Sequence, residues 1–215
     1  MRLLLILFIS GISLSLSMGG GAKSTNSQGI KDVLQEYRKA KFVQMDVEKM
    51  VYLELLERTD KSSGKLYFSG GHLLLNIMRP QKSMLLLNDE FIWMENRMGS
   101  GDNELIQVTK MKASKQLKKS NALLAFLFGD VEAWDKFKVI NVIGDMEDKE
   151  YTLLPAKEND LAEITKVKVK VDEKKKRLLK IVYWDELDNR IEYEFKNINF
   201  KAKLNNKIFK YTPPK

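Results

Sequence analysis

Apolar and polar residues alternate along much of this chain, and that alternation constrains the fold more than any other feature. Over residues 43–55 the odd positions are apolar, except at Lys49, whereas Gln, Asp and Glu fill many of the even positions. Residues 166–171 repeat the pattern with Lys and Val. Because successive side chains of a β-strand point to opposite faces, each segment predicts a strand with one buried face.

Short apolar runs continue through the rest of the chain, with turn-forming pairs between them. The clearest pairs are Gly70-Gly71, Asn88-Asp89, Gly144-Asp145 and Asp188-Asn189. This spacing predicts about a dozen strands, mostly consecutive and antiparallel. The composition and parity of the remaining segments predict a turn at residues 60–64, a β-bulge near Lys196-Asn197 and a last strand at residues 208–211.

Two segments predict helices. Over residues 29–39 the apolar side chains recur at helical spacing, at Ile30, Val33, Leu34 and Tyr37. Residues 121–128 form a second segment, which Asn121 can cap and Gly129 can end, and it is apolar nearly all round. Such a helix is either fully buried core or the cover of a cavity for an apolar ligand, and periodicity alone favours neither.

These elements predict an α+β fold in which a curved antiparallel sheet forms a half-barrel closed by a helical lid. A sheet of that size tends to curl, and helices must cover its apolar face. The chain has 215 residues, of which 44% are hydrophobic, so it is long enough for one domain with a core of its own.

The first 22 residues have the three parts of a secretory signal peptide. Arg2 gives a positive start, residues 3–16 form an apolar run, and small residues surround the end of that run. The run is shorter than the ~20 residues of a transmembrane helix. Its Gly-rich and Ser-rich flank argues against a buried core helix. We therefore expect residues 1–22 to be removed and residues 23–215 to form a single domain in the periplasm.

The net charge of +8 suits nucleic acid, an anionic membrane surface or an acidic partner. Export argues against nucleic acid. The Lys-rich tracts at residues 110–119 and 166–180 have two interpretations. They are either a solvated face or a surface that attracts anionic lipid headgroups or an acidic docking partner.

Catalytic chemistry has almost no support in the sequence. The chain has no Cys and one His, His72, which excludes thiol nucleophiles and Cys-ligated metal sites. Phosphate-binding glycine loops, the G-x-S-x-G elbow and the H-E-x-x-H motif are absent, and the acid pairs lie in predicted turns. We therefore expect a binding protein rather than an enzyme, with no catalytic residue, metal or cofactor.

Several short segments stand in the order and spacing of a known family. The matching segments, each with the family pattern it resembles, are residues 64–68 (GKLYF, a G-x-L-aromatic strand), 87–93 (LNDEFIW, an S-D-G-x-x-L-W strand pair), 107–109 (QVT, a Q-V/A-T segment), 121–129 (NALLAFLFG, an N-T-P-x-x-L-L-x-G helix), 154–155 (LP, an L-x-P strand end) and 209–214 (FKYTPP, a closing F-x-F-x-P-P). On these segments, residues 30–214 resemble the bacterial outer-membrane lipoprotein carrier family, the LolA-like periplasmic chaperones.

The resemblance implies a monomeric carrier whose apolar cavity binds the acyl chains of lipoproteins without any covalent step. The implied partners are acylated lipoproteins, an inner-membrane lipoprotein-releasing ABC transporter and an outer-membrane lipoprotein receptor. Six residues lie at positions that match the family's cavity, and for each of them an ordinary role in the hydrophobic core is an equally good interpretation. These lipid-binding candidates are Leu74, Met78, Trp93, Leu123, Phe126 and Leu127.

One departure from the family concerns control of the lid. The family carries an Arg-Pro pair after the first of these strands, and the arginine ties the sheet to the lid, whereas this chain has Gly70-Gly71 there. Either Arg79, which also precedes a proline, reaches the lid instead, or no arginine latch exists. Because nine residues of strand rise roughly 30 Å, Arg79 belongs at the far end from Gly70, and we expect a lid without a latch.

Two further functions are compatible with the same elements. A periplasmic regulatory or sensor domain of this fold would bind lipid or protein to control a signalling partner, since fold does not determine function. A lipid hydrolase would need a nucleophile, for which the sequence has no signature.

The signal-peptide pattern leads to the first prediction. We expect the exported protein to begin after Ser17 or Ala22, because small residues at these positions suit signal peptidase. N-terminal sequencing of the periplasmic form measures this directly. A membrane-bound form that keeps Met1 would contradict the assignment.

Overall fold

The structure is a computed structural model, and it describes residues 27–99, 104–113, 137–156, 164–203 and 205–213. Within these residues eleven β-strands form one antiparallel sheet in the order β6-β5-β4-β3-β2-β1-β11-β10-β9-β8-β7. The strands are β1 (Val43–Leu53), β2 (Arg58–Ser69), β3 (His72–Arg79), β4 (Ser83–Leu87), β5 (Phe91–Met98), β6 (Leu105–Lys112), β7 (Phe137–Ile143), β8 (Lys149–Pro155), β9 (Ile164–Asp172), β10 (Arg177–Asp185) and β11 (Arg190–Asn199). The sheet is open, with β6 and β7 at its edges.

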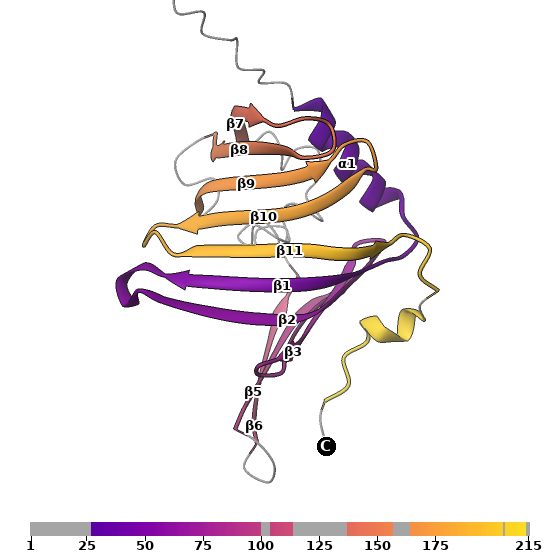
Figure 1. Ribbon diagram of the computed structural model, residues 1–215. Helices are drawn as coiled ribbons and strands as arrows, with labels where there is room; N and C mark the ends of the chain where they lie inside the picture. Colours follow the sequence, from indigo (N-terminus) through magenta and orange to yellow (C-terminus); the bar gives the residue numbers. More distant parts are fainter. Residues whose placement is uncertain (1–26, 100–103, 114–136, 157–163, 204, 214–215) are drawn as a thin grey trace, which may run out of the picture.

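The sheet is strongly curled. In Figure 1 the strands from β7 to β2 cross the view one below another, whereas β3, β5 and β6 run steeply behind them. The side chains of one face, called the inner face below, belong to a single apolar cluster with members on strands at both ends of the sheet, from Ile92 on β5 to Phe137 on β7. Curling lets this large sheet bury one face against itself as well as against a helix.

Helix α1 (Gln28–Lys39) confirms the helix predicted over residues 29–39. Its stripe of Ile30, Val33, Leu34 and Tyr37 is fully buried and joins the inner-face cluster. The helix lies near β9 and β10, as Figure 1 shows. The Tyr37 hydroxyl accepts a hydrogen bond from the Leu178 backbone N–H at 2.9 Å, which fastens the helix to the start of β10.

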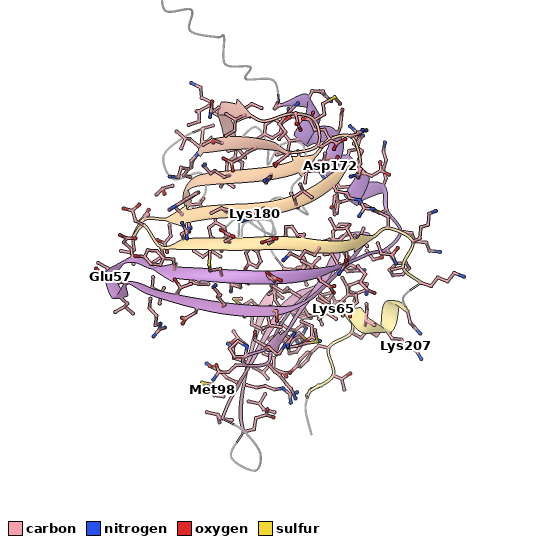
Figure 2. The ribbon with its side chains drawn as sticks, viewed as in Figure 1. Glu57, Lys65, Met98, Asp172, Lys180 and Lys207 are labelled. Atoms are coloured by element: carbon pink, nitrogen blue, oxygen red, sulfur yellow. The ribbon has the colours of Figure 1, made fainter. Side chains whose placement is uncertain are left out.

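The turn expected at residues 60–64 is wrong, because these residues lie inside β2. The chain reverses earlier, in a short 3₁₀ helix at Glu54–Leu56, and Glu57 takes a left-handed conformation with φ of 46° (Figure 2). The polar residues at 58–61 are exposed strand residues rather than turn residues. Gly64 is needed for a different reason: a Cβ there would lie 2.0 Å from the Asn76 carbonyl oxygen on β3.

Two further predictions concern the end of the chain. The β-bulge near Lys196-Asn197 is confirmed, since β11 has an extra residue opposite β1 between Gln44 and Asp46, and Asn197 has φ of 52°. The last strand expected at residues 208–211 is wrong. A 3₁₀ helix, η3 (Asn206–Phe209), covers the first half of that segment, and residues 210–211 are not in a strand. The Asn205 side chain caps the helix by accepting from the Lys207 N–H at 2.9 Å.

The large antiparallel sheet with a helix on its inner face therefore matches the expected fold class in its coarse form. The predicted helix over residues 121–128 lies outside the described residues, as does the predicted signal peptide. The helical lid and the enclosed cavity accordingly stay predictions. Among the described residues, no helix has both the length and the apolar character needed to span a bilayer.

The buried contact of Tyr37 yields a stability prediction. In Tyr37→Phe the N–H of Leu178 loses its acceptor inside the core, so we expect the free energy of unfolding to fall by about 1–3 kcal/mol in denaturant titrations. Tyr67→Phe is the control, because this half-buried hydroxyl has no hydrogen-bond partner among the described residues. Equal losses in the two variants would contradict the anchoring role of Tyr37.

Candidate functional site

The inner face carries apolar side chains that the described residues cover only in part. Leu85 on β4 and Met94 on β5 lie directly opposite each other, and both are half-buried against the main cluster. The same holds on the other side of the sheet for Ile191 on β11 and Tyr183 on β10. The half-buried apolar strand residues that pack against the main cluster are Leu85, Met94, Met111, Val139, Val142, Tyr183 and Ile191.

One row of polar groups interrupts this apolar face. Lys49 on β1 pairs with Ser62 on β2 and with Tyr193 on β11, so the three side chains share the inner face. The Lys49 ammonium lies 5.7 Å from the centre of the Tyr193 ring. Burial lowers the pKa of Lys49 from its ordinary value, because the charged form loses hydration there.

Two tyrosine hydroxyl groups adjoin this row. Those of Tyr183 and Tyr193 lie close enough that each affects the pKa of the other. Burial raises the pKa of Tyr183 to about 12 and raises that of Tyr193 well above its ordinary value. Both phenols therefore keep their protons at neutral pH and can act as hydrogen-bond donors.

The opposite, outer face has an apolar cluster of its own beneath the C-terminal segment. Phe209 of η3 is buried there with Phe42 and Leu86. Tyr211 stacks on Trp93 with ring centres 4.3 Å apart, and Lys110 lies 4.7 Å from the centre of the Trp93 ring. This cluster is separate from the inner-face cluster.

A buried carboxylate completes the attachment of the C-terminal segment. Glu95 on β5 accepts hydrogen bonds from Arg97 Nε at 2.8 Å and from the Tyr211 hydroxyl at 3.1 Å. Glu95 is 7% exposed, so these two partners compensate for the hydration that it has lost. Desolvation and the neighbouring Glu95 raise the pKa of Tyr211.

A second feature of the outer face is a groove of about 840 Å³. The outer-face residues Glu48, Ser63 and Glu194 line it together with Arg79 and Pro80, and the inner-face residues Lys49 and Ser62 also contribute to its lining. A register shift beside Gly64 places Arg79 opposite Ser63. Arg79 is exposed, and it has no ion-pair partner among the described residues.

The structure divides the predicted lipid-binding residues into three groups. Leu74 and Trp93 belong to the outer cluster beneath the C-terminal segment, away from the main apolar face. Met78 lies at the register shift near the end of β3 and is 45% exposed. Leu123, Phe126 and Leu127 lie outside the described residues. The lipid-binding role of all six stays a prediction.

The predicted lid-control positions lie far apart. Gly70 and Gly71 form the two-residue turn between β2 and β3, with φ of 52° and 95°. Arg79 lies at the other end of β3. Because the residues of the predicted lid lie outside the described ranges, the absence of a latch also stays a prediction.

No catalytic arrangement emerges within the described ranges. His72 Nε2 lies 3.0 Å from the exposed Asp89 carboxylate, and its ring lies 5.5 Å from that of Phe209, which is a packing position. No group of three or more His, Asp or Glu side chains in the described part of the chain could hold a metal ion. The inner face is therefore the best candidate for a binding site.

Sequence reasoning missed the polar row on this face. Its one visible signal is Lys49, the only break in the apolar odd positions of residues 43–55. Ser62, Tyr183 and Tyr193 lie on three other strands, so only the strand pairing brings them to the same area.

A model of the family described as outer membrane lipoprotein carrier protein LolA matches residues 36–212, which is most of the chain. The match confirms the resemblance drawn from the sequence segments. None of the curated proteins matches the chain.

Solved structures with a similar fold share little sequence with this chain. An uncharacterized conserved protein from Thermus thermophilus is 11% identical, with 86% of this chain and 93% of that chain covered and a TM-score of 0.52. A LolA superfamily protein from Nitrosomonas europaea is 13% identical over 87% and 99% of the two chains, with a TM-score of 0.45. Pseudomonas aeruginosa MucB, solved in complex with MucA, is 10% identical over 86% and 60% of the chains, with a TM-score of 0.44.

The raised pKa of Tyr183 predicts a specific loss of stability in alkali. In the unfolded chain a tyrosine ionises near pH 10, but Tyr183 in the folded protein holds its proton to about 12. The free energy of unfolding therefore falls between these pH values, by up to about 1.4 kcal/mol per pH unit for this group. Tyr183→Phe removes this contribution. Denaturant titrations at pH 8 to 12 are expected to show a shallower fall for the variant, and parallel curves would contradict the assignment.

Proposed function

This chain belongs to the outer membrane lipoprotein carrier protein LolA family, and on that premise we propose that it binds the acyl chains of lipoproteins and carries them across the periplasm from the inner to the outer membrane. Acyl chains do not cross an aqueous compartment unshielded, because each CH₂ exposed to water costs about 0.8 kcal/mol. A container needs an apolar surface that its own fold leaves accessible.

The observation that supports this proposal is the half-buried apolar surface on the inner face. Leu85, Met94 and Met111 lie on neighbouring strands at one side of the sheet, whereas α1 lies against β9 and β10. Methionine side chains adapt to ligands of irregular shape. We propose that acyl chains contact this area, and the placement favours these residues over Leu74 and Trp93.

The remaining parts of the carrier proposal rest on the family. The proposed lid is the apolar segment at residues 121–128, with Leu123, Phe126 and Leu127 toward the acyl chains and without an arginine latch from Arg79. The proposed partners are an inner-membrane lipoprotein-releasing ABC transporter and an outer-membrane lipoprotein receptor. The protein works as a monomer, and binding requires no covalent step.

The proposal is tested first on the isolated protein with a palmitoylated peptide. Met94→Glu places a carboxylate on the inner face, so we expect binding to weaken at least tenfold, as measured by fluorescence titration. Met146→Glu is the matched control, because Met146 is 58% exposed between β7 and β8, and its affinity should stay within twofold of wild type. Met78→Glu tests the predicted role of Met78, and on this proposal it should weaken binding less than Met94→Glu does. The opposite ranking would move the acyl site to the end of β3.

Identification of the natural cargo then tests the transport role. The protein is purified from the periplasm without detergent, and the bound species are identified by mass spectrometry. The carrier proposal predicts lipoproteins with intact acyl chains in the wild type and their loss in Met94→Glu. A non-acylated protein bound equally by both would instead support the periplasmic regulatory function.

A further inference from the structure

Lys49 is a cation in a position that the strand pattern reserves for apolar side chains. The residues two positions away on the same face, Val47 and Val51, are apolar, and Val47 is almost fully buried. Across the ladder Lys49 faces Tyr193, which is 4% exposed and part of the main cluster. An ammonium group at such a position loses hydration, and a compensating anion normally accompanies it.

No such anion lies beside Lys49 among the described residues. The nearest inner-face acid on β2 is Asp60, opposite Val51, and Asp60 is paired with Arg58 at 2.8 Å. Within the described part of the chain, the Lys49 ammonium contacts only the Tyr193 ring. A ring at 5.7 Å replaces only part of the hydration that the ammonium has lost.

Lysines on the outer face of the same sheet differ in this respect. Lys65 lies 2.8 Å from Asp46, Lys180 lies 2.7 Å from Glu192, and Lys196 lies 3.0 Å from Glu48 (Figure 2 labels the first two lysines). Carboxylates on these strands thus pair with several outer-face lysines, and among the described residues none pairs with Lys49. A half-buried cation without an acid partner is suited to an anion from outside the chain.

Other donors surround the same point. The Ser62 hydroxyl belongs to the residue opposite Lys49 on β2, and the phenols of Tyr193 and Tyr183 follow on β11 and β10. Next to these donors lies an apolar cross-strand pair, Val51 on β1 and Ile191 on β11. A charged donor, hydroxyl donors and an apolar surface within one area match an amphiphile with an anionic headgroup.

We propose that Lys49, with Ser62 and the Tyr183–Tyr193 pair, binds the anionic headgroup, a carboxylate or a phosphate, of an acyl ligand whose chain lies along the apolar inner face. This inference rests on the proposed function and adds a preference for negative charge at one end of the ligand. The positive charge of Lys49 also weakens the binding of any ligand that carries a free amine at that end.

The test compares matched probes in wild type, Lys49→Met and Lys61→Met. The probes are oleate, oleoyl lysophosphatidate and monooleoylglycerol, titrated below their micelle concentrations by displacement of a fluorescent acyl probe. Lys49→Met keeps the length of the side chain and removes its charge. Lys61→Met is the control, because Lys61 is exposed on the neighbouring strand opposite Met50, on the outer face.

We expect the wild type to bind at least one anionic probe about tenfold more tightly than monooleoylglycerol, a typical effect of one charge-assisted hydrogen bond. Lys49→Met should lose that preference and bind monooleoylglycerol within twofold of wild type, whereas Lys61→Met should behave as wild type. Preference for oleate identifies a carboxylate, and preference for lysophosphatidate identifies a phosphate.

Three results would overturn the inference. The first is equal affinity of the wild type for charged and neutral probes, which leaves the carrier proposal intact. The second is an equal loss of affinity for all three probes in Lys49→Met, which would show that Lys49 has only a packing role. The third is failure of the wild type to bind any acyl probe, and only this result would also contradict the proposed function.

Discussion

The apolar inner face of the sheet needs a cover, and the rest of the molecule is arranged around that need. Alternation along the strands turns about half of their side chains to this face, and burying them is the main favourable term in folding. Helix α1 places four side chains on it near β9 and β10, and curling brings both ends of the sheet into the same cluster. The side chains that remain half-buried include Leu85, Met94 and Met111, on strands at the other side of the sheet.

The outer face meets the same physical requirement by two other means. On β1 and β8–β11 its positions carry Lys and Glu in cross-strand pairs such as Lys168–Glu150, which need no cover. On β3–β5 the outer positions Leu74, Leu86 and Trp93 are apolar, and there the C-terminal segment packs over them through Phe209 and Tyr211. Phe209 and Tyr211 thus shield an apolar patch, and their segment does not extend the sheet.

Local pattern predicted the elements well and their faces poorly. Helix α1 and the β11 bulge followed from spacing and parity alone, because each depends on a few consecutive residues. Leu73, Leu74 and Leu75 form an uninterrupted apolar run, so periodicity does not say which of them faces inward. Strand pairing decides this: Leu73 and Leu75 join the main cluster, whereas Leu74 joins the outer one. The composition of residues 60–64 suggested a turn, partly because it includes Gly64. Gly64 is instead required by the close approach of the Asn76 backbone on β3, which the sequence alone does not reveal.

A wholly apolar surface binds an acyl chain strongly but without a preferred direction, since hydrophobic contact is not directional. One charged point changes this, because a headgroup placed at Lys49 sets which end of the ligand lies there and how far its chain extends toward Val51 and Ile191. The charge also adds a specific contact whose strength depends on the ligand rather than on buried area. The break in alternation at Lys49 is thus the point on the inner face where ligand chemistry, rather than packing, best accounts for the residue.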